Sequence, residues 1–526
     1  MTLPDHPELS ILIVVDSDAL SAFIPALATL LRREFSAQVK LEVVSNGSGS
    51  DAAPLATLLS LEKMIVRRNR PCWADRIAKA DIHDLLETRS NQSFSFVIDL
   101  TKGTQKHAQP VWRPLYNGAA GEPALASSLL FLGTPKISIS VQREASAQPA
   151  IICGGTASLE SAAGIGGAME AVWSRTTMLL VKAIRGELQK TGSQACDLQD
   201  AAEAPLISTG ATLRYGASAL AAAAANAAYS LCCHRPHWRV GWRFSNISND
   251  VWASRSLGGA TWNILKDPID HFYADPFPVF WRGRDYIFFE DLDHKTQKGI
   301  ISVVEFDAEG RPGPPIPVLE EPWHLSYPFI IEADGEIWMI PEASLSGQIT
   351  AYRAIEFPWR WEKHATLVSD VEAGDATIVA HNDRLWMFAV IRQGIGGYSD
   401  ALAMWSSGHL FGQWQPHPAN PVLIDDREAR PAGAMVRRNG QLLRPVQDCR
   451  SGYGAALGLA RVTKLDDEGF AQIVETRLAP GSSSWPGRKL HSLNGNGRLE
   501  VIDGSVPRPK MPLARHLVDR IYRPAT

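Results

Sequence analysis

The sequence is poor in cysteine, and the cysteines it has are badly spaced for cross-linking or metal binding. Six occur in 526 residues, and none forms a Cys-x-x-Cys pair. Zinc sites are typically marked by such pairs, and the disulfide frameworks of small secreted domains by a much higher density of cysteine. We therefore expect free thiols, no disulfide framework and no metal site.

A strong excess of charge is also lacking. Lys and Arg number 52 and Asp and Glu 56, which gives a formal net charge of −4. This balance provides no bulk attraction to nucleic acid or to an anionic membrane. No GxGxxG motif follows the first apolar strand, so a dinucleotide is not indicated and no cofactor is identified.

Targeting and membrane signals are weak. The start, MTLPDHPELS, is acidic and lacks the basic-then-apolar order of a signal peptide, which predicts a cytoplasmic protein. Residues 215–233 carry no charge, but they are mostly alanine, which inserts poorly into bilayers. We expect a buried or linker helix there, with no stable membrane span.

Composition changes near residue 235 and divides the chain. Thirteen of the sixteen tryptophans follow this point, whereas Ala-rich helical patterns alternate with short apolar strands before it. The sequence predicts an α/β domain over 1–190, a helical linker over 191–236, a β-rich domain over 237–510 and a tail over 511–526.

The N-terminal pattern is that of an open α/β sheet, whose ligands bind at the carboxyl ends of strands. ILIVVD ends at Asp16 and FSFVIDL contains Asp99, so both aspartates are candidate site residues. The run from Asp99 through VWRPLYNGAAGEP to the helix at Ala168 weakly resembles a formyltransferase domain. That resemblance implies a catalytic Asn–His–Asp set, of which Asn117 is present and the His is absent from its place. A scaffolding role for this domain is the alternative.

The C-terminal part contains a fivefold repeat of a Gly/Asn/Asp turn followed by an aromatic or aliphatic strand. The strands begin at Tyr286, Ile337, Leu385, Leu442 and Leu499, at spacings of 51, 48, 57 and 57 residues. Repeats of this length predict the blades of a β-propeller. The fifth blade runs out of chain after two strands. We expect residues 238–244 and 260–267 to complete it and to close the ring.

In such a ring the first strands of the blades enter at one pole, and polar residues recur at that position. They are Asp275, His324, Ser326, Tyr327, Asp375, Arg430 and His491, with Glu290, Glu342 and Asp448 at the ends of second strands and Trp323 as a stacking platform. Carboxylates and Arg bind sugar hydroxyls, and aromatic faces stack on sugar rings. Each residue also has a structural interpretation, as a turn cap, a rim ion pair, a buried histidine or blade packing.

The motifs ADPF, HLSYPF, WMIPEAS, DAT, NPVLIDDREARPAG and LRPVQDC resemble the five-bladed propeller of the glycoside hydrolase 43/32/62/68 superfamily. They are nearer still to the propeller of glucosamine inositolphosphorylceramide transferase-type proteins. The resemblance implies that Asp275 is base or nucleophile and that Asp375 tunes the site. The hydrolases take their acid from a Glu on a later blade, but blade four starts Arg430-Pro431-Ala432-Gly433. Glu342 would have to take the place of this acid.

Three functions follow as hypotheses. The first is hydrolysis or transfer of a glycosyl unit at the propeller pole by paired carboxylates, with a carbohydrate or glycoconjugate as substrate. The second is a non-catalytic glycan-binding accessory of polysaccharide or glycolipid synthesis, which the missing Glu of blade four favours. The third is acyl or formyl transfer to an amino sugar by the N-terminal domain, which requires His107 or another histidine near Asn117.

Overall fold

The computed structural model describes residues 9–522, except 46–51, 88–92, 104–106, 189–204, 393–394, 482–484 and 486. The chain divides into two compact units, residues 1–224 with 394–397 and residues 225–393 with 398–526. Each is described by itself. Among the described helices, none is both long enough and apolar enough to cross a membrane.

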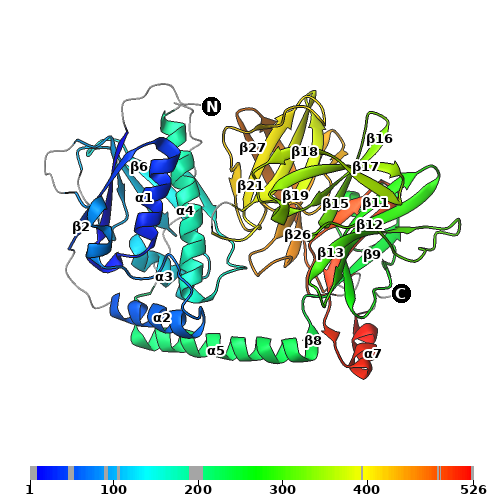
Figure 1. Cartoon of the computed structure of the whole chain (residues 1–526), viewed down its shortest axis with the longest axis horizontal. Helices are drawn as coiled ribbons and strands as arrows, with labels where there is room; N and C mark the ends of the chain where they lie inside the picture. The colour runs from blue at the N-terminus through cyan, green and yellow to red at the C-terminus, as the bar shows by residue number, and fades with distance from the viewer. Residues whose placement is uncertain are drawn as a thin grey trace. The chain divides into compact units, whose positions relative to one another are not determined.

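The N-terminal unit is built on one mixed sheet (Figure 1). Its strands are β1 (Ser10–Asp16), β2 (Gln38–Val44), β3 (Phe96–Asp99), β4 (Val111–Tyr116), β5 (Ala119–Ala120), β6 (Lys136–Gln142) and β7 (Ala150–Thr156). The order is β2-β1-β3-β4-β6-β7, with β5 paired to β4. The β2, β1, β3 and β4 pairings are parallel, and those of β6 are antiparallel. The expected α/β sheet is present, while the formyltransferase resemblance stays a prediction.

The helices of this unit are α1 (Phe23–Phe35), α2 (Ala52–Ile65), α3 (Gly121–Phe131) and α4 (Gly164–Leu188), with 3-10 turns η1 (Ser17–Ala19) and η2 (Lys79–Leu85). Helix α4 contacts α1, α2, α3, β6 and β7 and is almost wholly buried. Helix α5 (Thr209–Cys232) occupies the expected linker. Most of its residues are exposed, so it is not the buried helix that its alanine content also allowed.

The second unit is a five-bladed propeller, as the repeats predict. Blades one to four are β11-β12-β13-β14, β15-β16-β17-β18, β19-β20-β21-β22 and β24-β25-β26-β27, with β23 added to β21. The bounds of blade one are His271–Trp281, Arg284–Asp293, Lys298–Glu305 and Ile316–Leu319. Those of blade two are Ser326–Ala333, Glu336–Glu342, Gln348–Glu356 and Arg360–Ser369, with η3 (Ser344–Ser346).

Blades three and four continue the same pattern. The bounds of blade three are Ala373–His381, Arg384–Ile391, Ala401–Ser407 and Gln415–Pro416, with β23 at Leu423–Ile424. Those of blade four are Val436–Arg438, Gln441–Asp448, Ala456–Asp466 and Gly469–Leu478. Each blade has a tight turn between its first two strands. In blade one both turn residues, Arg282 and Gly283, have positive φ, as a type I′ hairpin requires, and Asp334-Gly335, Asn382-Asp383 and Asn439-Gly440 repeat it.

Blade five combines strands from both ends of the unit. Its order is β10-β9-β29-β28, which joins Asn263–Ile264 and Trp238–Phe244 to Leu499–Ser505 and Leu493–Gly495. The central pairing of β9 with β29 runs from Trp238 opposite Ser505 to Phe244 opposite Leu499. A further pair, β8 (Cys233–His234) with β30 (Arg508–Pro509), lies just outside this blade. Short helices α6 (Val251–Ser254) and α7 (Pro512–Ile521) complete the unit, and α7 replaces the expected tail.

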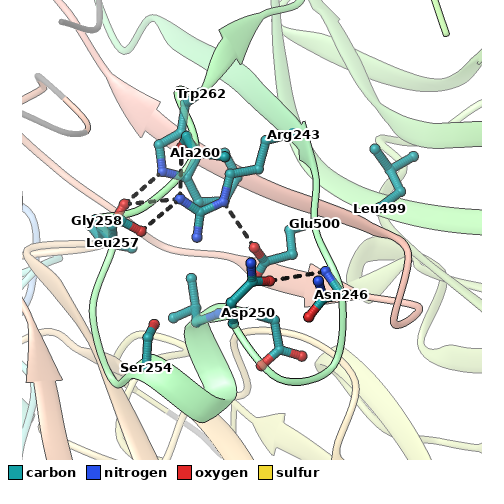
Figure 2. A network of polar contacts seen from close by, with 12 residues as sticks. Arg243, Asn246, Asp250, Ser254, Leu257, Gly258, Ala260, Trp262, Leu499 and Glu500 are labelled. Atoms are coloured by element: carbon teal, nitrogen blue, oxygen red, sulfur yellow. Dashed lines mark hydrogen bonds and ion pairs between the residues drawn. The ribbon is translucent and has the colours of Figure 1, made fainter.

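A buried ion pair fixes the upstream strand β9 in this blade. The Arg243 Nε atom lies 2.8 Å from Glu500 Oε2, and both side chains are almost fully buried. Figure 2 shows Arg243 also donating to the carbonyls of Leu257, Gly258 and Ala260. The other Glu500 oxygen accepts the backbone N–H of Val251 at 2.6 Å. The ion pair therefore connects the loop between β9 and β10 to strand β29.

We predict that Glu500→Ala lowers the free energy of unfolding of the propeller by about 3–5 kcal/mol, because it leaves the Arg243 charge buried without its partner. Glu475→Ala is the matched control, since its pairs with Arg255 and Arg461 are partly exposed and contribute at most about 1 kcal/mol. Urea unfolding followed by tryptophan fluorescence measures both. Equal losses for the two variants would contradict the role given to this pair.

Candidate functional site at the propeller pole

A repeated distortion of the first strands sets the geometry of the pole. In blades one, two and three the pairing shifts register just after Ala274, Ser326 and Gly374. The next residue in each blade, Asp275, Tyr327 and Asp375, has a positive φ of 50°, 43° and 56°. A β-bulge of this kind redirects a side chain and leaves local strain. Such strain at three equivalent positions is typical of a functional site.

Arg430 lies among the carboxylates of blades two and three. Its Nε donates to Asp375 Oδ2 at 2.6 Å, and its NH2 group lies 3.7 Å from Glu342 Oε2. The guanidinium also stands over the Tyr453 ring, 4.7 Å from the centroid. Gln447 donates to Asp375 as well, at 3.4 Å. Arg430 thus joins Asp375 and Glu342, two of the residues expected at the pole.

His491 and Asp503 form a second group around Asp275. The His491 Nδ1 atom lies 2.6 Å from Asp503 Oδ2 and 3.8 Å from Asp275 Oδ1. The His491 ring stacks on Trp238 at a centroid distance of 3.9 Å. Asp503 accepts the backbone N–H groups of Asp275, His491 and Ser492. Asp503, Trp238 and Tyr453 were not among the residues expected from the sequence.

Burial and mutual repulsion change the acidity of these groups. Burial, with Asp503 and Asp375 nearby, raises the pKa of Asp275 to about 7, although His491 opposes the shift. Burial also raises the pKa of Asp375 to about 7 against the effect of Arg430. The pKa of Glu290 is raised well above its usual range by burial and by Asp275. Burial lowers the pKa of His491, but Asp503 and Asp275 outweigh it, so that the net pKa is raised.

The remaining expected residues fall into two sets. Glu290 accepts a contact from His324 Nε2 at 3.3 Å, and Ser326 is buried opposite Glu342. Tyr327 is hydrogen-bonded to Thr377 Oγ1 at 2.9 Å, and burial raises its pKa. These four residues therefore belong with the pole.

Asp448 and Trp323 do not join the pole among the described contacts. Asp448 is paired with Arg450 and Arg477, both at 2.7 Å, and these partners hold its pKa low despite burial. Trp323 packs against the apolar core between blades one and two. Both residues were predicted from their positions in the sequence, and position alone does not show which neighbours a side chain contacts.

In the N-terminal unit the expected residues hold loops in place. Asp99 accepts Thr101 N–H and Oγ1 and pairs with Arg113, while Asp16 accepts the N–H of Lys102 at 2.8 Å. Asn117 bonds the N–H of Lys136 and the hydroxyl of Ser128. Among the described residues no hydrogen bond links His107 to Asn117, and His107 Nε2 is buried without a hydrogen-bond partner. The role of this unit in formyl transfer stays a prediction.

The only described cluster with metal-ligand geometry is Asp275, His491 and Asp503, whose ligand atoms lie within 4.8 Å of one another. The oxygens of Asp503 already accept three backbone N–H groups and contact His491. Their geometry fits a clamp between the first strands of blades one and five, and no metal is inferred.

We predict that Asp275→Asn changes stability in a pH-dependent way. A carboxyl whose pKa is raised on folding binds its proton more tightly in the native state, so stability falls as pH rises from about 4 to about 7. Wild type should therefore lose stability relative to the variant between pH 5 and pH 8, and the difference between the two proteins should grow by more than about 1 kcal/mol over that range.

Urea midpoints at the two pH values measure this. Asp448→Asn is the control: its pKa is lowered on folding, so the stability it contributes is lost only as pH falls below about 4, and its effect should be the same at both values. An Asp275→Asn effect that is equally independent of pH would contradict the assignment.

Comparison with known proteins shows which proteins the second unit resembles. Residues 254–503 match the family model described as "Glucosamine inositolphosphorylceramide transferase 1, N-terminal". The chain is 32% identical over 247 residues to the Arabidopsis thaliana protein of that name, covering 44% of this chain and 32% of that protein. It is 31% identical over 248 residues to the Oryza sativa subsp. japonica protein, covering 44% and 33%. The chain thus spans about a third of the length of these curated relatives.

Solved structures with a similar chain path include the catalytic domain of a GH62 α-L-arabinofuranosidase from Coprinopsis cinerea. It shares 12% identity, with a TM-score of 0.33, and the match covers 50% of this chain and 97% of that one. A family 117 glycoside hydrolase from Zobellia galactanivorans shares 10% identity, with a TM-score of 0.33 and coverage of 50% and 90%. The resemblance expected from the sequence motifs is confirmed: the propeller of this chain is similar to the N-terminal region of the glucosamine inositolphosphorylceramide transferases.

Proposed function

We propose that the pole of the propeller binds a glycosyl unit and cleaves or transfers it. The observation that carries this proposal is the group of buried carboxylates around Arg430 and His491, two of which have a pKa of about 7. Enzymes place such perturbed acids where protons must be given and taken near neutral pH. The curated relatives are named as transferases of glucosamine inositolphosphorylceramide, which supports a carbohydrate as the ligand.

Reaction at a glycosidic bond needs one carboxyl to protonate the departing oxygen and another to deprotonate the incoming hydroxyl or to attack the sugar. We assign the second role to Asp275, which forms no ion pair with an arginine among the described residues and lies 3.8 Å from His491. Glu342, at the end of β16, is the candidate proton donor. Asp375 is paired with Arg430, and its charge acts on both Asp275 and Glu342.

Glycan binding without catalysis is the second candidate, and the position of Arg430 favours it. This residue begins blade four, where the resembling hydrolases would supply the acid, and its charge is directed at Asp375 and Glu342. Carboxylates tied to a guanidinium still accept hydrogen bonds from sugar hydroxyls, but a neighbouring positive charge favours the ionised form, which has no proton to donate. Binding in that case would depend on Arg430 and on the face of Tyr453.

The decisive experiment is turnover of a mixed panel of aryl glycosides, furanosides included, and sugar-nucleotide donors. We predict that Asp275→Asn lowers turnover by about a hundredfold or more, because it removes the base or nucleophile. Asp307→Asn, in an exposed turn of blade one, is the matched control and should retain wild-type rates. Turnover that survives in Asp275→Asn would exclude catalysis at this pole.

If wild type turns over no member of the panel, calorimetry with the same saccharides tests whether the pole binds a glycan without reacting with it. We predict that Arg430→Met weakens saccharide binding about tenfold or more, because a charge-assisted contact is lost. Binding unaffected by this substitution would remove the pole from consideration.

A further inference from the structure

Helix α7 is amphipathic, but it is mounted with its polar side against the domain. Asp519 pairs with Arg239 and Arg508, and the Tyr522 hydroxyl accepts Arg488 Nε at 3.2 Å. The side chains of Ala514 and Val518 are half-buried. A surface helix of a globular protein normally turns its apolar stripe toward the core. In α7 ion pairs and hydrogen bonds hold the helix from its polar side, so the stripe is left outside.

The outward side of α7 is strongly apolar. Leu513 is 84% exposed, and Leu517 and Ile521 are each 61% exposed. These residues follow one another at intervals of four, so they form one line along the helix. Met511 and Leu231, 68% and 78% exposed, lie near the start of the helix, where Lys510 bonds the carbonyls of Ser230 and Cys232. We call these five side chains, Leu231, Met511, Leu513, Leu517 and Ile521, the α7 stripe.

The charged side chains beside the stripe are positive: Arg520 is exposed on the same side of the helix, and Lys510 precedes the helix. His516 is also exposed on that side. Arg515 bonds the carbonyls of Pro509 and Lys510, which are neutral acceptors. The one acid between residues 510 and 522 is Asp519, which is turned inward. The helix therefore presents a local basic and apolar surface on a chain whose overall charge is −4.

We propose that α7 docks the propeller on an anionic lipid bilayer. Helices with exposed leucines flanked by Lys and Arg lie in the headgroup region, with the apolar side inserted and the basic groups near anionic lipid. A second copy of the chain fits less well. A stable protein interface uses about 20–30 residues a side, and two copies would bring like charges together. The proposal goes beyond the chemistry of the pole and does not depend on it.

Co-sedimentation of the full chain with vesicles tests the proposal. Wild type should sediment with phosphatidylcholine–phosphatidylglycerol vesicles and not with phosphatidylcholine alone, and added salt should weaken this binding. Leu513→Glu combined with Leu517→Glu should reduce binding about tenfold or more. Arg520→Glu should reduce it less. Ile473→Glu, an equally polar change at an exposed site on β27, should leave it intact.

The substituted side chains are exposed, so the far-UV spectrum and the melting temperature should stay at wild-type values. Three results would overturn the proposal. Wild type could stay in the supernatant with every vesicle. The double variant could sediment as wild type does. Finally, the double variant could convert a wild-type dimer to a monomer without changing vesicle binding, which would make the stripe a contact between copies.

Discussion

Closure of the ring is the constraint on which the propeller depends. Five sheets around a channel leave two free edges unless the last blade is completed, and exposed strand edges invite pairing with other chains. Here the chain enters the unit with β9, builds four blades and returns to pair β29 against β9. The Arg243–Glu500 pair fixes these strands at their outer end, and Asp503 fixes the inner end. Both contacts join residues more than 200 positions apart.

The same closure creates the electrostatics of the pole. Asp503 holds the backbone of blade one against that of blade five, and it also orients His491 toward Asp275. Asp275, Asp375 and Glu290 are buried at this pole, and burial raises the pKa of each, with neighbouring carboxylates adding to the shift. Burying like charges lowers stability, so their persistence together in one place is a sign of function rather than of folding. Arg430 compensates part of this cost on the side of blade three.

Much of the fold was predictable because its signals are local. Turn residues such as Arg282-Gly283 mark the hairpins, since only certain residues adopt positive φ easily. The completion of blade five by upstream strands was predictable because an open ring leaves strand edges exposed. Asp275 and Asp375 were found because they occupy the same place in the repeat. Asp503 lies at the end of a strand in the fifth repeat, at the position that Glu290 and Glu342 occupy in the first two repeats. The repeat alone therefore points to Asp503, which was not among the predicted site residues.

Other features of the pole depend on contacts that strand position does not encode. Asp448 satisfies the same pattern as Glu342, yet Arg450 and Arg477 draw it into a separate ion cluster. Tyr453 comes from the loop between β25 and β26, where no strand register fixes the position of its ring. The orientation of α7 was also hidden, because its apolar spacing alone predicts a buried stripe, whereas Arg239 and Arg508 hold its polar side instead.

Proton transfer at the pole requires carboxyl groups that are still partly protonated at neutral pH. A carbon-13 NMR titration of the aspartate carboxyl groups, with Asp275→Asn and Asp375→Asn used for assignment, measures this. We predict two carboxyls that titrate near pH 7 and disappear one at a time in the two variants. Titration of every aspartate carboxyl near its ordinary value of about 3.9 would contradict the account.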